Sequence, residues 1–222
     1  MKPRFLGKSG LEIGGPSRIF QTDHLIPVYD VCKTIDICNF SLRNIWSESA
    51  GSREFVSNIG KTFTGEAGDL QTVPDASYEF VLASHVLEHT ANPLRALREW
   101  RRVLVPGGVL LVIVPDKRNT FDHRRAVTCF EHIESDFQAD VREDDVSHIE
   151  EILSLHDLEL DPEAGSAEQF RERCLRNISV RAMHHHVFDS DLLRHLLDHI
   201  EMKILNTAVE QPFHIIGFAE KV

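Results

Sequence analysis

The stretch YEFVLASHVLEHTANPLRALREWRRVLVPGG, residues 78–108, runs directly into the apolar segment VLLVIV, residues 109–114. Residues 80–83 form a short apolar run, which is typical of a parallel strand that is covered on both faces. The segment 109–114 has the same character. The sequence therefore predicts two buried strands with a helix between them.

The helix is predicted by its cap and by the spacing of its apolar residues. Asn92 can cap the first turn, and Pro93 suits the first helical position. Large apolar side chains recur at helical spacing at Leu94, Leu97, Trp100 and Leu104. The run 106–108, Pro-Gly-Gly, is expected to end the helix. Because such strand–helix–strand units cross over right-handedly, the pattern predicts a doubly wound sheet.

Two phrases in this unit, SHVLEH (84–89) and RRVLVPGG (101–108), resemble the fourth and fifth strands of class I S-adenosylmethionine (SAM) dependent methyltransferases. The resemblance implies an α/β fold with a doubly wound, mostly parallel seven-stranded sheet, helices on both faces and a terminal antiparallel hairpin. It also implies SAM as the cofactor, and it leaves the substrate open. Residues 1–222 are expected to form a single domain of this class.

Composition narrows the possible partners. The 222 residues carry a net charge of −11, which argues against a broad nucleic-acid surface. The four cysteines form no CxxC pair, so a cytoplasmic location is the simplest expectation. No apolar run approaches membrane-spanning length, so no membrane partner is expected. The oligomeric state stays open.

A glycine pair follows the first predicted strand, in SGLEIGGPS, residues 9–17. Glycines let a backbone approach a ligand closely, although such a pair also marks ordinary turns. The resemblance gives Glu12 a part in ordering this loop, and gives Gly14 and Gly15 the contact with the amino-acid part of SAM. Pro16 and Ser17 depart from the family's alternating glycines.

Asp36 ends the second predicted strand. An acidic side chain there can accept both ribose hydroxyls of a nucleotide, as in dinucleotide sites. The alternative is a surface Asp in a turn, with Asp30 as the fallback ribose ligand.

The resemblance implies two further cofactor contacts. Asp69 and Leu70 match the pair that meets the adenine amino group and packs the ring, and the alternative is a polar loop before a strand. Ser84 and His85, at the end of the fourth predicted strand, are expected to face the sulfonium region.

A long stretch separates the fifth strand from the predicted terminal hairpin at 202–210 and 213–220. It is too long for the single crossover helix that the sheet needs. We therefore expect a helical, His-rich lid within residues 116–200, at the ligand-binding edge.

Histidines concentrate in this insertion and suit proton transfer near neutral pH. The candidate bases are His123, His132 and His184. Arg124, or its neighbour Arg125, can hold a substrate carboxylate or phosphate, and His185 and His186 are candidate substrate contacts. Exposed or core positions are the alternative for each.

The spacing of these histidines matches no compact metal signature, so no metal site is predicted. A site would have to be assembled from distant segments. His148 lies within one helical turn of Glu150 and Glu151 and is the nearest approach to a local pair.

The leading expectation is an enzyme, a SAM-dependent transferase that methylates a small-molecule acceptor in a His-assisted site under a lid. One alternative keeps SAM but changes the reaction, through attack on the aminopropyl arm or cyclisation that releases methylthioadenosine. Another is a non-catalytic methyltransferase-like partner module, which the unusual glycine loop favours and the acidic residues at 12, 36 and 69 oppose.

Overall fold

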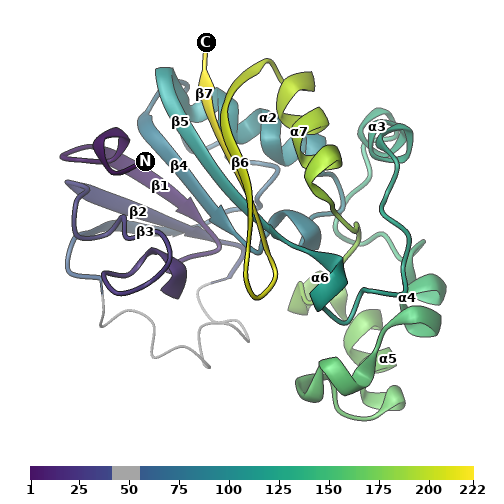
Figure 1. Cartoon of the computed structure of the whole chain (residues 1–222). Coiled ribbons are helices and arrows are strands. Elements are labelled where there is room, and N and C mark those ends of the chain that lie inside the picture. The colour runs from purple at the N-terminus through teal and green to yellow at the C-terminus, as the bar shows by residue number, and fades with distance from the viewer. Residues whose placement is uncertain (42–55) are drawn as a thin grey trace.

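Seven strands form one sheet in the order β3-β2-β1-β4-β5-β7-β6 within residues 1–41 and 56–222, the part that the computed structural model describes (Figure 1). They are β1 (Ser9–Ile13), β2 (Thr34–Asn39), β3 (Ile59–Thr64), β4 (Tyr78–Ser84), β5 (Leu104–Pro115), β6 (Met202–Glu210) and β7 (His214–Lys221). β1 to β5 are parallel, and β7 pairs antiparallel with β5 and β6. The predicted mostly parallel sheet and terminal hairpin are confirmed.

The predicted helix after β4 is α2 (Pro93–Val103). Asn92 caps it, because its side-chain oxygen accepts a hydrogen bond from the Arg95 amide at 3.0 Å. The helix ends before the Pro-Gly-Gly run, which lies inside β5 where the register with β4 shifts between Tyr78 and Phe80. The expected turn is therefore an irregularity of the strand, with Gly107 at a φ of +74°.

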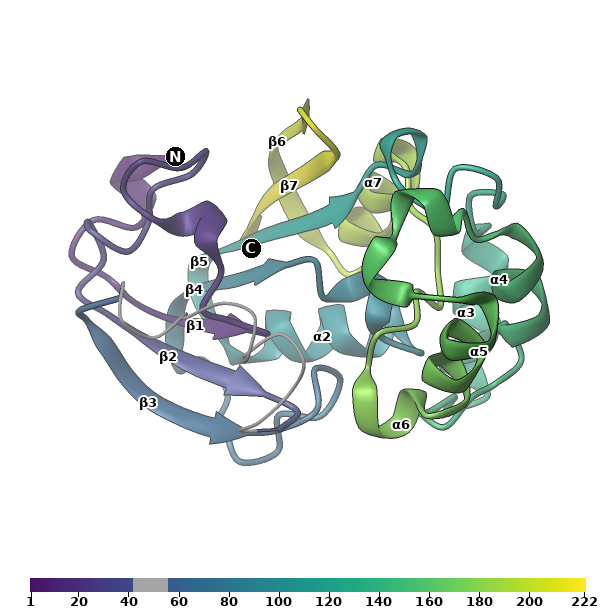
Figure 2. The same ribbon diagram turned by 90° about the horizontal axis from the view of Figure 1, so that it is seen from below.

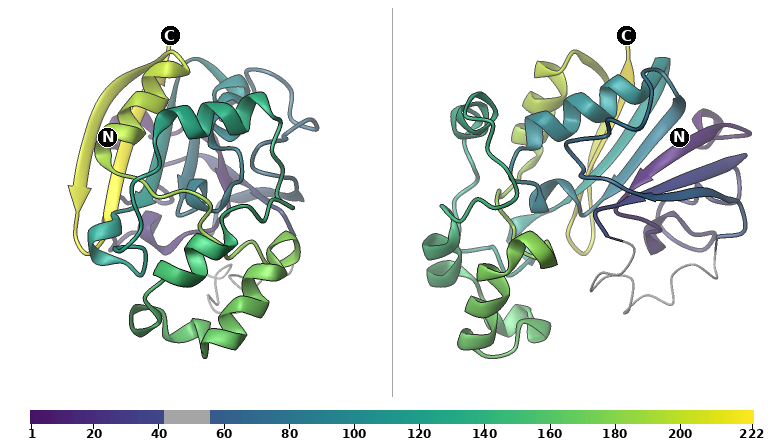
Figure 3. Two further views of the ribbon diagram at one scale, coloured as in Figure 1. Left: turned by 90° about the vertical axis from the view of Figure 1, so that its right-hand side faces the viewer. Right: turned by 180° about the vertical axis from the view of Figure 1, so that it is seen from behind.

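Apolar layers cover both faces of the sheet. On one face lie α2, α7 (Ser190–His199) and α3 (Phe130–Gln138), which bury Trp100 and Leu193 against the strands (Figure 3). On the other face, the described residues contribute the N-terminal segment with the short 3-10 helices η1 (Lys2–Arg4) and η2 (Arg18–Phe20). Their Phe5 and Phe20 join Phe80 in a second core.

A helical insertion between β5 and α7 lies beyond the carboxyl ends of the parallel strands (Figure 2). Besides α3 it holds α4 (Ile149–Leu155), α5 (Ala167–Leu175) and α6 (Asn177–Val180), with the 3-10 helices η4 (Lys117–Asn119), η5 (Leu158–Leu160) and η6 (Pro162–Ala164). Ile152, Phe170 and Cys174 belong to a small core of its own. This insertion stands where a lid was expected.

Residues 182–188, which we call the strap, return the chain from α6 toward the sheet without regular secondary structure. The His185 amide donates to the Glu88 carbonyl oxygen at 2.8 Å, which ties the strap to η3 (Leu87–His89). The Thr128 amide donates to the Val187 carbonyl oxygen, and the Val187 amide donates to the Thr128 hydroxyl oxygen. Three consecutive histidines are thus buried between the insertion and the sheet.

Among the described residues, no helix is long and apolar enough to cross a membrane.

Candidate active site

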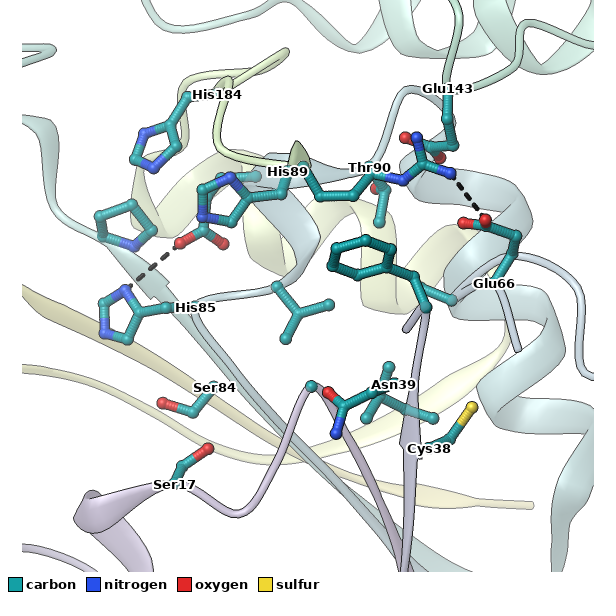
Figure 4. Close-up of a pocket in the computed structure, with 18 of the residues that line it drawn as sticks. Ser17, Cys38, Asn39, Glu66, Ser84, His85, His89, Thr90, Glu143 and His184 are labelled. Atoms are coloured by element: carbon teal, nitrogen blue, oxygen red, sulfur yellow. Dashed lines mark hydrogen bonds and ion pairs between the residues drawn. The ribbon is translucent and has the colours of Figure 1, made fainter. Parts of the chain in front are cut away.

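A cavity of about 470 Å³ lies between the carboxyl ends of β1 to β5 and the helical insertion. Such edges are where open α/β sheets bind ligands. The strand side contributes Gly14, Ser17, Asn39, Glu66, Ala67 and Ser84, and the other side contributes Phe121, Glu143, Arg181, His184 and Phe213. In Figure 4 His85, His89 and His184 lie together, while Glu66 and Glu143 lie at the opposite end.

Glu12 holds the glycine loop in place. Its buried carboxylate accepts hydrogen bonds from the Ser17 amide at 2.9 Å and the Tyr29 hydroxyl at 2.8 Å. A Cβ added at Gly15 would lie 2.2 Å from the Glu12 carboxyl carbon, so only glycine fits there. Burial outweighs the hydrogen bonds from Ser17 and Tyr29 and raises the pKa of Glu12 to about 7.

Gly14 lines the cavity with a φ of +78°, and a Cβ there would come 2.4 Å from Val86 Cγ2. The loop therefore needs both glycines for its conformation. Gly15 faces Glu12 and does not line the cavity, so of the pair only Gly14 is placed for ligand contact.

Asp36 requires a correction. It lies inside β2 rather than at its end, and its carboxylate accepts from the Lys61 amide at 2.7 Å and the Tyr78 hydroxyl at 2.8 Å. It does not line the cavity. Asn39 ends the strand, lines the cavity, and donates to the Gly15 carbonyl oxygen at 2.7 Å. Asp30, the fallback, is exposed and lies outside the cavity lining.

Asp69 and Leu70 are also corrected. Leu70 is buried in the core beneath α2, and Asp69 lines a separate shallow surface depression beside Arg95. The β3 end turns earlier than expected, so Glu66 and Ala67 line the cavity instead. Arg181 donates to Glu66 at 2.6 Å and lies over the Phe40 ring, 5.4 Å from its centroid.

Ser84 and His85 lie at the end of β4 and line the cavity, where the sequence predicted them. His85 adopts a φ of +54°, which turns the chain sharply out of the strand. Its Nε2 lies 2.9 Å from His214 Nδ1. Burial, followed by the charge of His85, lowers the pKa of His214 to about 4, so His214 is neutral near pH 7.

Glu88 is a fully buried carboxylate among imidazoles. Neither of its oxygens has a hydrogen-bond partner within the described residues, although His85 Nδ1 lies 3.3 Å from Oε1. Burial acts to raise the pKa of Glu88, but His85, His89 and His184 outweigh burial and lower it. Burial and then His184 lower the pKa of His89 to about 4, despite Glu88. The cavity thus contains a fixed anion beside a neutral imidazole.

His184 is the predicted base that the structure brings into the cavity. Its Nδ1 lies 2.5 Å from Asp122 Oδ2. Burial acts to lower the pKa of His184, but the Asp122 carboxylate outweighs burial and raises it. The same pairing, joined by Arg125, overcomes burial and lowers the pKa of Asp122 to about 2.

Arg125 stabilises the pairing of His184 with Asp122. Its side chain is 1% exposed, and it donates to the carbonyl oxygens of His184 at 2.9 Å and His185 at 3.1 Å. It also reaches Asp122 at 3.1 Å. Arg125 therefore holds the strap and does not line the cavity.

His123 and Arg124 are placed outside the cavity, which corrects both predictions. Each bonds to Asp157 Oδ2, His123 at 2.8 Å and Arg124 at 2.7 Å. Their side chains are 37% and 50% exposed on the insertion. The alternative reading, an exposed charged loop, describes them.

The remaining predicted residues also lie elsewhere. His185 is buried against Asn177, whose amide nitrogen lies 3.0 Å from its Nε2, and His186 lies 3.2 Å from the Ala91 carbonyl oxygen. His132 lies on α3 beside His148. None of the three lines the cavity.

Sequence reasoning missed Glu88, His89, Glu143 and Arg181. The first two stand in the SHVLEH phrase, where two titratable residues follow a strand end, and that was an available signal. Glu143 lies in an acidic run whose sequence suggests a solvated turn, yet burial raises its pKa to about 7 and it accepts from the Ala91 amide at 3.2 Å. Nothing local marks Glu143 or Arg181.

Part of the chain is similar to known methyltransferase domains. A family model described as a methyltransferase domain matches residues 20–112. An uncharacterized 37.1 kDa protein in transposon TN4556 of Streptomyces fradiae is 47% identical over 53 residues, which is 23% of this chain. The match spans 15% of that relative's length.

Solved structures share the fold. A SAM-dependent methyltransferase from Mesorhizobium loti superposes with a TM-score of 0.58 at 11% identity, over 99% of this chain and 93% of that one. One from Aquifex aeolicus superposes with a TM-score of 0.53 at 12% identity, over 98% and 84% of the two chains.

Proposed function

We propose that this chain is a class I SAM-dependent methyltransferase that methylates a small-molecule acceptor in the cavity beneath its helical insertion. The methyltransferase-domain model that matches residues 20–112 and the shared fold support this assignment. The observation that carries the proposal is that two walls of different character line that cavity. One wall consists of strand-end residues suited to a nucleotide cofactor, and the other consists of insertion residues that include His184, whose imidazole is paired with Asp122 behind the cavity lining.

The strand-end wall suits SAM. Gly14 offers backbone without a side chain, and the Asn39 amide supplies polar atoms at the end of β2. Ala67 and Val86 add apolar surface for a ring. SAM, when bound, supplies a methyl group already activated on sulfur, so the protein has to position an acceptor and exclude water.

His184 is our proposed general base. Its Nδ1–H donates to Asp122, so Nε2 is left to take a proton from an acceptor hydroxyl or amine. Glu88, with its unpartnered oxygens, would receive a donor group of the acceptor or balance positive charge nearby. The insertion serves as the lid in this proposal, and residues 116–200 provide its substrate-facing surface. Such base catalysis contributes roughly 10²–10⁴-fold in rate.

The test is mass spectrometry of the protein incubated with methyl-labelled SAM and the low-molecular-mass filtrate of a cell extract. We expect S-adenosylhomocysteine together with a labelled small molecule. His184→Gln should lower the rate by roughly 10²-fold or more while calorimetric SAM affinity stays within about twofold. His123→Gln, outside the cavity, is the matched control and should keep the rate.

Other products would redirect the assignment. Methylthioadenosine formed without an acceptor would replace methyl transfer with attack on the aminopropyl arm or cyclisation. Labelled macromolecules from a parallel incubation with unfiltered extract, with no labelled small molecule from the filtrate, would overturn the small-molecule acceptor. Failure to bind SAM and S-adenosylhomocysteine would overturn cofactor use and favour the partner module.

A further inference from the structure

Four potential metal ligands meet within the insertion and the strap, outside the cavity lining. They are His132 and Asp136 of α3, His148 directly before α4, and His186 of the strap. One ligand atom from each lies within 4.8 Å of the others. None of the four lines the cavity, so this cluster is separate from the candidate active site.

The distances between the ligand atoms fit a tetrahedrally coordinated cation. His132 Nε2 lies 3.3 Å from Asp136 Oδ2 and 3.3 Å from His148 Nε2. His186 Nε2 lies 3.7 Å from the same Asp136 oxygen. Zinc bonds to His nitrogen and carboxylate oxygen measure about 2.0–2.2 Å, which makes each edge of a tetrahedron about 3.3–3.6 Å.

One ligand atom in the cluster lacks a hydrogen-bond donor. Asp136 Oδ2 is buried and receives no hydrogen bond from any described residue. The imidazoles around this carboxylate oxygen lie near it without donating to it. The side chains of His186 and His148 are 0% and 12% exposed. A buried carboxylate oxygen without a donor is costly unless a cation satisfies it.

A second carboxylate supports one ligand from behind. Glu151 Oε2 lies 3.9 Å from His148 Nδ1, the ring nitrogen on the far side from His132. At 3.9 Å this contact is longer than a hydrogen bond, and a small movement of the Glu151 side chain would give His148 the carboxylate partner that metal-bound imidazoles have in known sites. His186 Nε2 also lies 3.2 Å from the Ala91 carbonyl oxygen, a contact that a cation would displace.

We propose that His132, Asp136, His148 and His186 bind one divalent transition-metal ion of the zinc class as a closed structural site. Four protein ligands leave no open position, which is typical of structural rather than catalytic zinc. The ion would join α3, the start of α4 and the strap. Because His186 lies two residues after His184, the site would fix the strap that carries His184 to the cavity.

The experiment measures metal directly, without SAM. Full-length protein is stripped with a chelator, loaded with Zn²⁺, dialysed and analysed by elemental mass spectrometry, and its melting temperature is recorded with and without Zn²⁺. We expect about one zinc per chain, a rise in melting temperature on loading, and the visible absorption of tetrahedral Co²⁺ when cobalt replaces zinc.

Variants locate the ion. His132→Gln changes a side chain that is 42% exposed, so the fold should persist, and Asp136→Asn is the second variant. Both should weaken Zn²⁺ binding by at least tenfold. His24→Gln, at an exposed histidine outside the cluster, is the control.

Three outcomes would overturn the proposal. These are no zinc retained by the unmodified protein, equal affinity in His132→Gln and the control, or zinc lost only in His89→Gln. The last would assign the ion to the other cluster, Glu88, His89 and His184. Since no arm uses SAM, these outcomes are independent of the methyl-transfer test.

Discussion

Asp122 accepts a hydrogen bond from Nδ1 of His184 although the two residues are separated by most of the helical insertion. Both side chains are more than nine-tenths buried, at 4% and 8% exposure. The bond fixes which ring nitrogen of His184 remains for proton transfer. It also makes the protonation of His184 depend chiefly on the Asp122 carboxylate, with a smaller contribution from Glu88.

The first prediction concerns the pKa of His184. It should titrate above its ordinary value of about 6.5, because Asp122 stabilises the imidazolium more than burial destabilises it. As a base His184 must be deprotonated, so its active form increases as pH rises through the raised pKa. Histidine NMR titration, with the signal assigned by its loss in His184→Gln, should show a lower midpoint for His184 in Asp122→Asn than in the unmodified protein. Equal His184 midpoints in the unmodified protein and in Asp122→Asn would contradict this account.

A second prediction concerns stability and Glu12. Its folded pKa of about 7 exceeds its unfolded value of 4.5, so the folded state keeps a proton that the unfolded state releases between these pH values. The free energy of unfolding should therefore fall as pH rises through that window, by up to about 3 kcal/mol. Glu12→Gln should lack this loss. In urea denaturation, the free energy of unfolding of the variant should therefore rise relative to that of the unmodified protein between pH 5 and pH 8 (about the span of the shift). If the free energy of unfolding changed with pH in the same way in both proteins, the explanation would be ruled out.

Cofactor binding should depend on Asn39 and not on Asp36. Asn39 lines the cavity and holds the glycine loop, whereas the Asp36 carboxylate is engaged by Tyr78 and Lys61. Calorimetric titration with S-adenosylhomocysteine should show roughly tenfold weaker binding for Asn39→Ala, as expected for the loss of about 1.4 kcal/mol. Asp36→Asn should remain within about twofold. The reverse order would restore the assignment made from the sequence.

Arg125 and Arg124 should differ sharply in their effect on stability. Arg125→Met removes a buried guanidinium that satisfies Asp122 and two strap carbonyls, so it should cost about 3–5 kcal/mol of unfolding free energy. Arg124→Met removes an exposed ion pair with Asp157 and should cost at most about 1 kcal/mol. Urea denaturation of both variants checks the pair. Equal losses would mean that Arg125 does not hold the strap.

The strand ends explain why only part of the site could be predicted. Gly14, Ser84 and His85 were predicted because the resemblance assigns them to strand ends, and the parallel sheet places all such ends at one edge. Glu12 was predicted in the same way and lies inside β1, where it supports the glycine loop. Asp36 and Asp69 were misplaced because a shift of only a few residues in where a strand ends decides which side chain reaches the cavity. Local sequence does not define strand ends that closely.

The sequence by itself determined β4, the crossover helix α2, β5, the glycine loop and the position of the insertion, because apolar periodicity and capping residues act over a few neighbouring positions. The seven-stranded sheet was expected from the family resemblance. Only the tertiary structure decided which histidines meet. His184 reaches the cavity, His185 is buried against Asn177, and His186 joins His132 and Asp136, although the triplet is continuous in sequence. The physical reason is that successive side chains of an extended strap point in different directions, and their surroundings come from segments far away along the chain.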